Sequence, residues 1–155
     1  MTDYIPAVTD RDVYITRSFN APIDVVWKFW TEPDLLAQWF GPHGITIDRS
    51  TVEVDAREGG TWALAMHDEQ GIYPLSSTIV TLVEPEYLEL VMEAETGLGP
   101  VDKIILRVQF HDHGETTRMT LHQGPWVAPE LRDLTLDGWL QSFDKLATII
   151  DGSAA

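Results

Sequence analysis

The sequence contains no cysteine among its 155 residues. This absence excludes disulfide bonds, catalytic thiolates and zinc sites built on thiolates. Basic residues are also scarce, since 10 lysines and arginines stand against 25 aspartates and glutamates and give a net charge of −15. A nucleic-acid-binding surface needs a basic footprint, and anionic lipid attracts polybasic segments, so neither nucleic acid nor a membrane surface is expected as a partner.

Long hydrophobic runs are missing as well. The longest unbroken apolar run covers five residues, 62–66, whereas a membrane-spanning helix needs about 20. The N-terminus has no basic region followed by an apolar core, so no secretory signal is expected. We therefore expect a cytoplasmic protein without membrane insertion, formed by a single domain over residues 12–151 with flexible termini at 1–11 and 152–155.

Hydrophobic periodicity predicts the elements of this domain. Alternation over residues 13–19 predicts a first strand, and two short helices in tandem follow, the first capped by the side chain of Asn20 and the second beginning near Pro33. A helix over residues 129–151 ends the domain, with its apolar residues on one stripe. Between the helices the pattern predicts six further strands, at about 45–54, 60–67, 73–83, 86–95, 101–111 and 115–123.

This order of elements describes an α+β domain. Short turns between consecutive strands favour an antiparallel meander. The simplest packing places the apolar stripe of the terminal helix on the concave face of a curved, seven-stranded antiparallel sheet. Both Trp27 and Trp30, on the first helix, are expected in the core.

Few polar motifs point to chemistry. His111 and His113 stand at a predicted hairpin tip without an assured third ligand, so no metal site is expected. His122 alternates with apolar neighbours and is expected on the outer face of the sheet. The pair Gly59 and Gly60 lacks the spacing of a phosphate-binding loop and predicts a tight turn with positive φ. No nucleophile motif is present, and we expect no cofactor.

Four strings of residues resemble the SRPBCC (START-like, helix-grip) superfamily, and within it the branch of single-domain homologues of the heat-shock-protein-90 ATPase activator. The strings are APIDVVW at 21–27, WFGP at 39–42, REGGTW at 57–62 and GWLQSFDKL at 138–146. Their order and spacing extend the resemblance over about residues 12–150. It implies a helix-grip fold with a deep apolar cavity between the sheet and the long helix.

Aromatic and methionine side chains on the inner faces either interdigitate as solid core or line such a cavity, and the resemblance favours the cavity. We expect a small apolar or aromatic ligand there. The predicted lining residues are Trp62, Leu64, Met66, Tyr73, Met92, Leu106, Phe110, Met119, Trp139 and Phe143, and the predicted polar groups are His67, Gln109 and Gln123.

Three functions stay open at this point. The first is non-enzymatic carriage or sensing of the ligand. The second is association with a chaperone through the acidic surface, although we do not expect the separate N-terminal domain of the eukaryotic activators. The third is a cyclase or hydratase using His67, Tyr73 or Glu93 as acid or base. The protein is expected to be a monomer or a homodimer.

Overall fold

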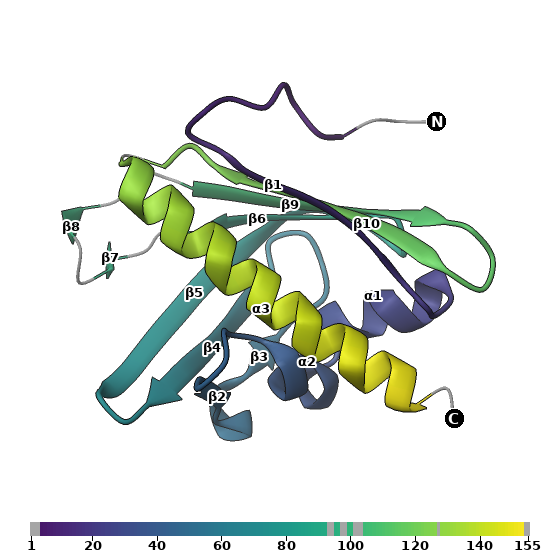
Figure 1. Ribbon diagram of the computed structural model, residues 1–155, viewed down its shortest axis with the longest axis horizontal. Coiled ribbons are helices and arrows are strands. Elements are labelled where there is room, and N and C mark those ends of the chain that lie inside the picture. Colours follow the sequence, from purple (N-terminus) through teal and green to yellow (C-terminus); the bar gives the residue numbers. More distant parts are fainter. Residues whose placement is uncertain (1–3, 93–94, 97–98, 101–103, 127, 154–155) are drawn as a thin grey trace.

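The computed structural model describes residues 4–92, 95–96, 99–100, 104–126 and 128–153 (Figure 1). Its α-helices are α1 (Ile23–Thr31), α2 (Pro33–Trp39) and α3 (Pro129–Ser153). None of these described helices combines the length and the apolar character that crossing a membrane requires. The strands are β1 (Val13–Phe19), β2 (Thr46–Ile47), β3 (Glu53–Val54), β4 (Thr61–Asp68), β5 (Gly71–Val83), β6 (Tyr87–Met92), β7 (Glu95–Thr96), β8 (Gly99–Pro100), β9 (Ile104–Asp112) and β10 (Thr117–Gly124).

The main sheet is antiparallel and follows the order β1-β10-β9-β6-β5-β4-β2. The strand predicted over 45–54 is divided, because β2 and β3 both pair with β4 and a 3₁₀ turn, η1 (Arg49–Thr51), separates them. The Asp48 carboxylate starts this turn by accepting hydrogen bonds from the backbone N–H (3.0 Å) and the hydroxyl (2.7 Å) of Ser50. With that correction, the predicted helix-grip fold with its curled seven-stranded sheet is confirmed.

Alternation along each strand separates an inner face of the sheet from an outer face. In β9, for example, Leu106, Val108 and Phe110 are buried on the inner face, while Arg107 and Gln109 belong to the outer face. Helix α3 crosses the inner face diagonally (Figure 1). The hydrophobic core therefore lies between this face, α1, α2 and the apolar stripe of α3.

The two short helices stand in tandem, as the sequence predicts, and Pro33 begins the second. The expected side-chain cap from Asn20 is wrong, because Pro22 occupies the N-cap position and no side chain bonds there. The Asn20 amide instead donates a hydrogen bond of 3.2 Å to the Asp151 carboxylate. The contact joins the start of α1 to the end of α3.

The described part of the N-terminus, residues 4–12, lies against the outer face of the sheet, and we call it the N-terminal strap (Figure 1). At its beginning, the ring of Tyr4 stacks on Tyr87 with centroids 4.0 Å apart. At its end, the Trp126 backbone N–H donates to the Arg11 carbonyl at 2.9 Å. The sequence assigns residues 1–11 to a flexible terminus, and the structure gives residues 4–11 these contacts.

Candidate functional site

The inner face of the sheet brings most of the predicted lining residues together. Eight of the ten belong to one buried cluster, and Met66 packs against it partly exposed. Tyr73 is different, because it is 41% exposed near the β4–β5 turn and its hydroxyl lies 3.2 Å from the Asp68 carboxylate. The buried eight are Trp62, Leu64, Met92, Leu106, Phe110, Met119, Trp139 and Phe143.

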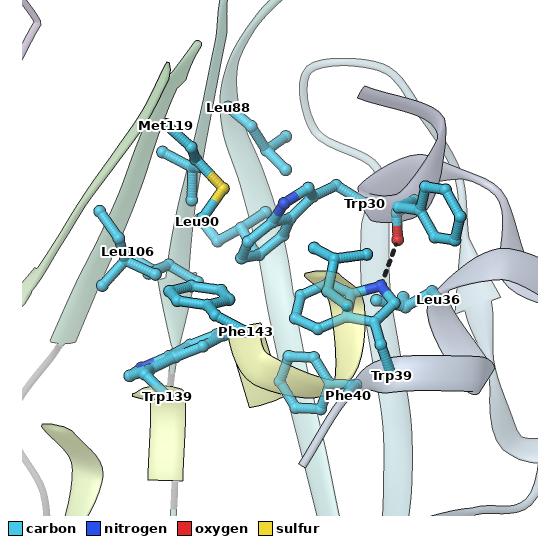
Figure 2. Close-up of a cluster of buried hydrophobic side chains, with 14 of the residues drawn as sticks. Trp30, Leu36, Trp39, Phe40, Leu88, Leu90, Leu106, Met119, Trp139 and Phe143 are labelled. Carbon is cyan, nitrogen blue, oxygen red and sulfur yellow. Dashed lines mark hydrogen bonds between the residues drawn. The ribbon is translucent and has the colours of Figure 1, made fainter. Parts of the chain in front are cut away.

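Aromatic rings fill the part of this interior next to α1 and α2 (Figure 2). Trp30 lies at their centre, with ring centroids 5.0 Å from Trp39 and 5.8 Å from Trp139. Phe40 contacts both Trp62 and Trp139 at 5.4 Å in edge-on geometry. Such spacings are those of rings in direct contact. This half of the interior is therefore packed core, which is the place the sequence predicts for Trp30.

The same tryptophans tie the sheet and α2 to the end of α1. The Trp39 indole N–H donates to the Phe29 carbonyl at 2.9 Å, and the Trp62 indole N–H donates to the Trp30 carbonyl at 3.0 Å. The last carbonyls of a helix lack partners within the helix, so these two bonds satisfy groups that burial would otherwise leave unpaired.

A strip of buried polar atoms crosses the inner face farther along the sheet. The Gln123 amide oxygen accepts a hydrogen bond of 2.7 Å from the Trp139 indole N–H, and its nitrogen lies 3.1 Å from the Met92 sulfur. Ser77 stands directly opposite Met92 in the β5–β6 register and is buried. Its hydroxyl has no hydrogen-bond partner among the described residues. Since buried hydroxyls are nearly always paired, this group marks a place where a further polar atom fits.

Helix α3 carries a glycine next to Trp139, and open space lies around it. A Cβ atom built on Gly138, the residue before Trp139, meets no atom within 4 Å. One turn earlier, Leu134 is 67% exposed. The glycine and the exposed leucine stand four residues apart and share one side of the helix. Close approach of another backbone therefore does not explain the glycine at this position.

The predicted polar groups are divided by the structure. Gln123 lies in the strip, next to Trp139. Gln109 lies on the outer face, where its side-chain oxygen accepts a hydrogen bond of 3.3 Å from the Tyr4 backbone N–H. His67 alternates with the inner-facing residues of β4, so it points to the other face, opposite Thr46 of β2. Burial and the neighbouring Asp68 carboxylate raise the pKa of Tyr73.

Proton transfer in the interior has a weak basis among the described residues. Tyr73 and His67 both stand apart from the strip, and Glu93, the carboxylate predicted as an alternative acid or base, falls outside the described residues. Ser77 is the residue of the strip that sequence reasoning missed. The available signal was its position two residues before Ile79 in the predicted strand 73–83. Residues two apart share one face of a strand, so this spacing places Ser77 on the apolar face.

Comparison with known proteins identifies a family whose sequences resemble this chain. The sequence profile of the family described as activator of Hsp90 ATPase homolog 1-like protein matches residues 20–151. No curated protein matches the sequence.

Solved structures share the fold at low identity. Protein NE0264 from Nitrosomonas europaea is 24% identical with a TM-score of 0.79, and the alignment covers 96% of this chain and 99% of that one. The AHSA1 protein from Silicibacter pomeroyi is 19% identical with a TM-score of 0.78, over 92% of this chain and 99% of that one. Protein Ms6760 from Mycobacterium smegmatis is 21% identical with a TM-score of 0.73, over 98% of both chains.

Proposed function

The chain belongs to the family of activator of Hsp90 ATPase homolog 1-like proteins, a branch of the SRPBCC superfamily, and on this premise we propose that it binds a small hydrophobic or aromatic ligand. The ligand occupies the inner face beside the N-terminal half of α3, next to the strip formed by Ser77, Met92, Gln123 and Trp139. Phe110, Met119 and Phe143 belong to the packed core behind it.

The unpaired hydroxyl of Ser77 is the observation that carries this proposal. Pockets for small molecules combine an apolar lining with a few polar groups that orient the ligand. Here Met92 and Trp139 supply apolar surface, and the Ser77 hydroxyl is a donor and acceptor beside them. A ligand with one polar atom on an apolar body satisfies Ser77 and replaces water on the surrounding side chains.

The space beside Gly138 supplies the entrance. A larger side chain at position 138 would obstruct the ligand without clashing with the protein, because no atom lies within 4 Å of a Cβ at this position. Glycine inside a helix also costs about 1 kcal/mol relative to alanine, so substitutions at this position favour the helix.

Two variants of Gly138 test the proposal with a neutral fluorophore, N-phenyl-1-naphthylamine. The native protein is expected to bind it saturably at one site. Gly138→Leu places a branched side chain in the entrance and is expected to weaken binding by about tenfold, which corresponds to about 1.4 kcal/mol. Gly138→Ala is the matched control, since it strengthens the helix equally well but adds only a methyl group, and it is expected to bind like the native protein.

Thermal unfolding of both variants verifies that they are folded. Absence of saturable binding by the native protein contradicts the proposal, as does equal binding by Gly138→Leu and Gly138→Ala. Native mass spectrometry of freshly purified protein is expected to show a retained small molecule, whose mass identifies the ligand class.

A further inference from the structure

A hollow lies on the outer face of the sheet, opposite the ligand site proposed above. It has a volume of about 690 Å³ and is bounded by strap residues 5–8 and by the outer-facing residues of β1, β9 and β10. We call it the outer pocket. Its size is within the range of about 300–1,000 Å³ that small-molecule sites occupy.

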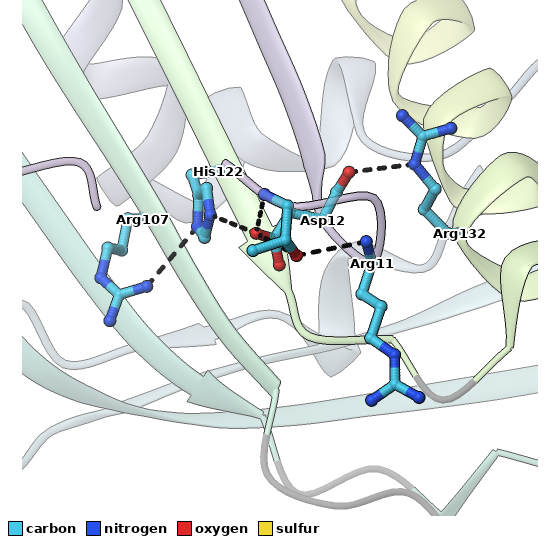
Figure 3. A network of polar contacts seen from close by, with 6 residues as sticks. Arg11, Asp12, Arg107, His122 and Arg132 are labelled. Atoms are coloured by element: carbon cyan, nitrogen blue, oxygen red, sulfur yellow. Dashed lines mark hydrogen bonds and ion pairs between the residues drawn. The ribbon is translucent and has the colours of Figure 1, made fainter. Parts of the chain in front are cut away.

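The strap is fixed at both ends, so it forms a wall of this pocket. Tyr4 stacks on Tyr87 at the first end. At the second end the Asp12 carboxylate lies 3.1 Å from the buried His122 ring, which in turn lies 3.5 Å from Arg107 (Figure 3). The Arg132 side chain also donates to the Asp12 carbonyl at 3.0 Å. Residues 5–8 therefore span the sheet between two anchored points.

The charge of the outer pocket is opposite to that of the protein. The chain has a net charge of −15, yet the residues lining the pocket include Arg118 and His111 and no aspartate or glutamate. The Arg118 guanidinium forms no hydrogen bond or ion pair within the described part of the chain, whereas Arg17, Arg49, Arg57 and Arg107 each meet a carboxylate. An unpaired guanidinium in such an acidic protein favours an anionic ligand.

The other end of the pocket is apolar. Val8 and Tyr14 are 49% and 46% exposed, and both line the hollow. The sheet register sets the distance between the two ends, because Arg118 pairs with Ser18 of β1, and Tyr14 lies four residues before Ser18. Four residues of strand extend about 13 Å. Between the ends, the outer-facing Thr16 and Thr120 stand side by side in the β1–β10 register.

From this arrangement we propose that the outer pocket binds a small organic carboxylate with an aromatic or branched apolar body. The two guanidinium nitrogens of Arg118 bond the carboxylate oxygens, a geometry that arginine forms in a bidentate manner. The threonine hydroxyls offer hydrogen bonds along the middle, and the apolar body lies between Tyr14 and Val8. This site is separate from the ligand site proposed on the inner face.

A pair of probes that differ only in charge tests this proposal: 2-naphthoate and the neutral 2-naphthylmethanol. Amide NMR shifts of the native protein are expected to move for Thr16 and Thr120 when 2-naphthoate is added, and binding is expected to weaken as salt is raised. Arg118→Gln is expected to weaken 2-naphthoate binding by about tenfold. The weaker binding of 2-naphthylmethanol is expected to be the same in both proteins.

Arg57→Gln is the matched control, because Arg57 is an exposed arginine outside the pocket, paired with Asp55. It is expected to bind 2-naphthoate like the native protein. Shifts confined to α3 and β4, equal binding by Arg118→Gln, or an equal loss in Arg57→Gln each overturn the proposal. None of these results depends on the neutral fluorophore, so this site and the inner site are tested separately.

Discussion

Replacement of Asp12 by alanine tests how the N-terminal strap is attached. The Asp12 carboxylate accepts hydrogen bonds from the backbone N–H and the hydroxyl of Thr9, at 2.9 and 3.0 Å, and lies 3.1 Å from Nε2 of His122. Asp12→Ala removes all three contacts at once. Thr9 is exposed, so its groups return to water at little cost, but His122 is only 3% exposed and keeps no comparable partner.

The expected loss of stability follows from the hydrogen bonds that Asp12 loses and from the buried His122 ring that is left without its partner. Hydrogen bonds to a charged group contribute about 1.5–3 kcal/mol, and a buried polar atom left without a partner costs about 1–3 kcal/mol. We therefore expect Asp12→Ala to lower the free energy of unfolding by about 3 kcal/mol. Amide hydrogen exchange over residues 4–11 is expected to accelerate more than that of the sheet, because the second anchor of the strap keeps only its bonds to backbone carbonyls.

The effect depends on pH in a defined direction. Burial acts to raise the pKa of Asp12, but the hydrogen bonds from Thr9 and the interaction with His122 outweigh it and leave the pKa below its usual value. A lowered pKa in the folded state adds stability that is present above the unfolded value of about 3.9 and lost as pH falls through the folded value. The difference between the native protein and Asp12→Ala is therefore complete near neutral pH and declines below about pH 4.

Urea denaturation followed by tryptophan fluorescence measures this difference. Asp12→Asn is the control, because it keeps the size of the side chain and one acceptor oxygen but loses the charge, and it is expected to cost about half as much. The reasoning is refuted if Asp12→Ala changes the free energy of unfolding by less than about 1 kcal/mol and leaves the exchange of residues 4–11 unaltered.

Three further substitutions have defined outcomes in the same denaturation assay. Trp139→Phe keeps the ring packing but leaves the buried Gln123 oxygen without its donor at 2.7 Å. A loss of about 1–3 kcal/mol is expected, and no loss is evidence against this hydrogen bond. Gly59→Ala forces a side chain onto φ +85° and is expected to cost about 1–2 kcal/mol. Gly60→Ala brings a Cβ to 2.0 Å from the Asp55 carbonyl oxygen and is expected to cost more than Gly59→Ala, because backbone has to move; the reverse order is evidence against this turn geometry.

The sequence predicts the fold well because its periodicities are strong. Inner-facing residues of β9 and β10 alternate without interruption, and register follows from burying that one face. The prediction of one continuous strand over residues 45–54 is wrong for a local reason. The Asp48 side chain accepts a hydrogen bond from a backbone N–H and turns the chain. The hydropathy of this stretch nevertheless resembles that of a strand.

The candidate site is predicted less completely, because alternation says which face a residue occupies but not what covers that face. Gln109 alternates with the inner-facing Val108 and Phe110 and therefore lies on the outer face, whereas Gln123 lies on the inner face and bonds Trp139. His122 is correctly expected on the outer face, yet it is buried there, because the N-terminal strap covers it. A polar segment gives no periodic signal for such a position.

The N-terminal strap is anchored through charged groups, and their energetics bear on its role. Burying Asp12 against His122, with Arg107 and Glu89 alongside, removes charged groups from water, and such networks are often no more stable than apolar packing of the same volume. Stability alone therefore does not explain why this segment is anchored through charges. An anchored strap does, however, hold residues 5–8 in place as one wall of the outer pocket. If this is its role, Asp12→Ala weakens the binding of 2-naphthoate under conditions where the domain stays folded, whereas an anchor that serves stability alone leaves that binding unchanged.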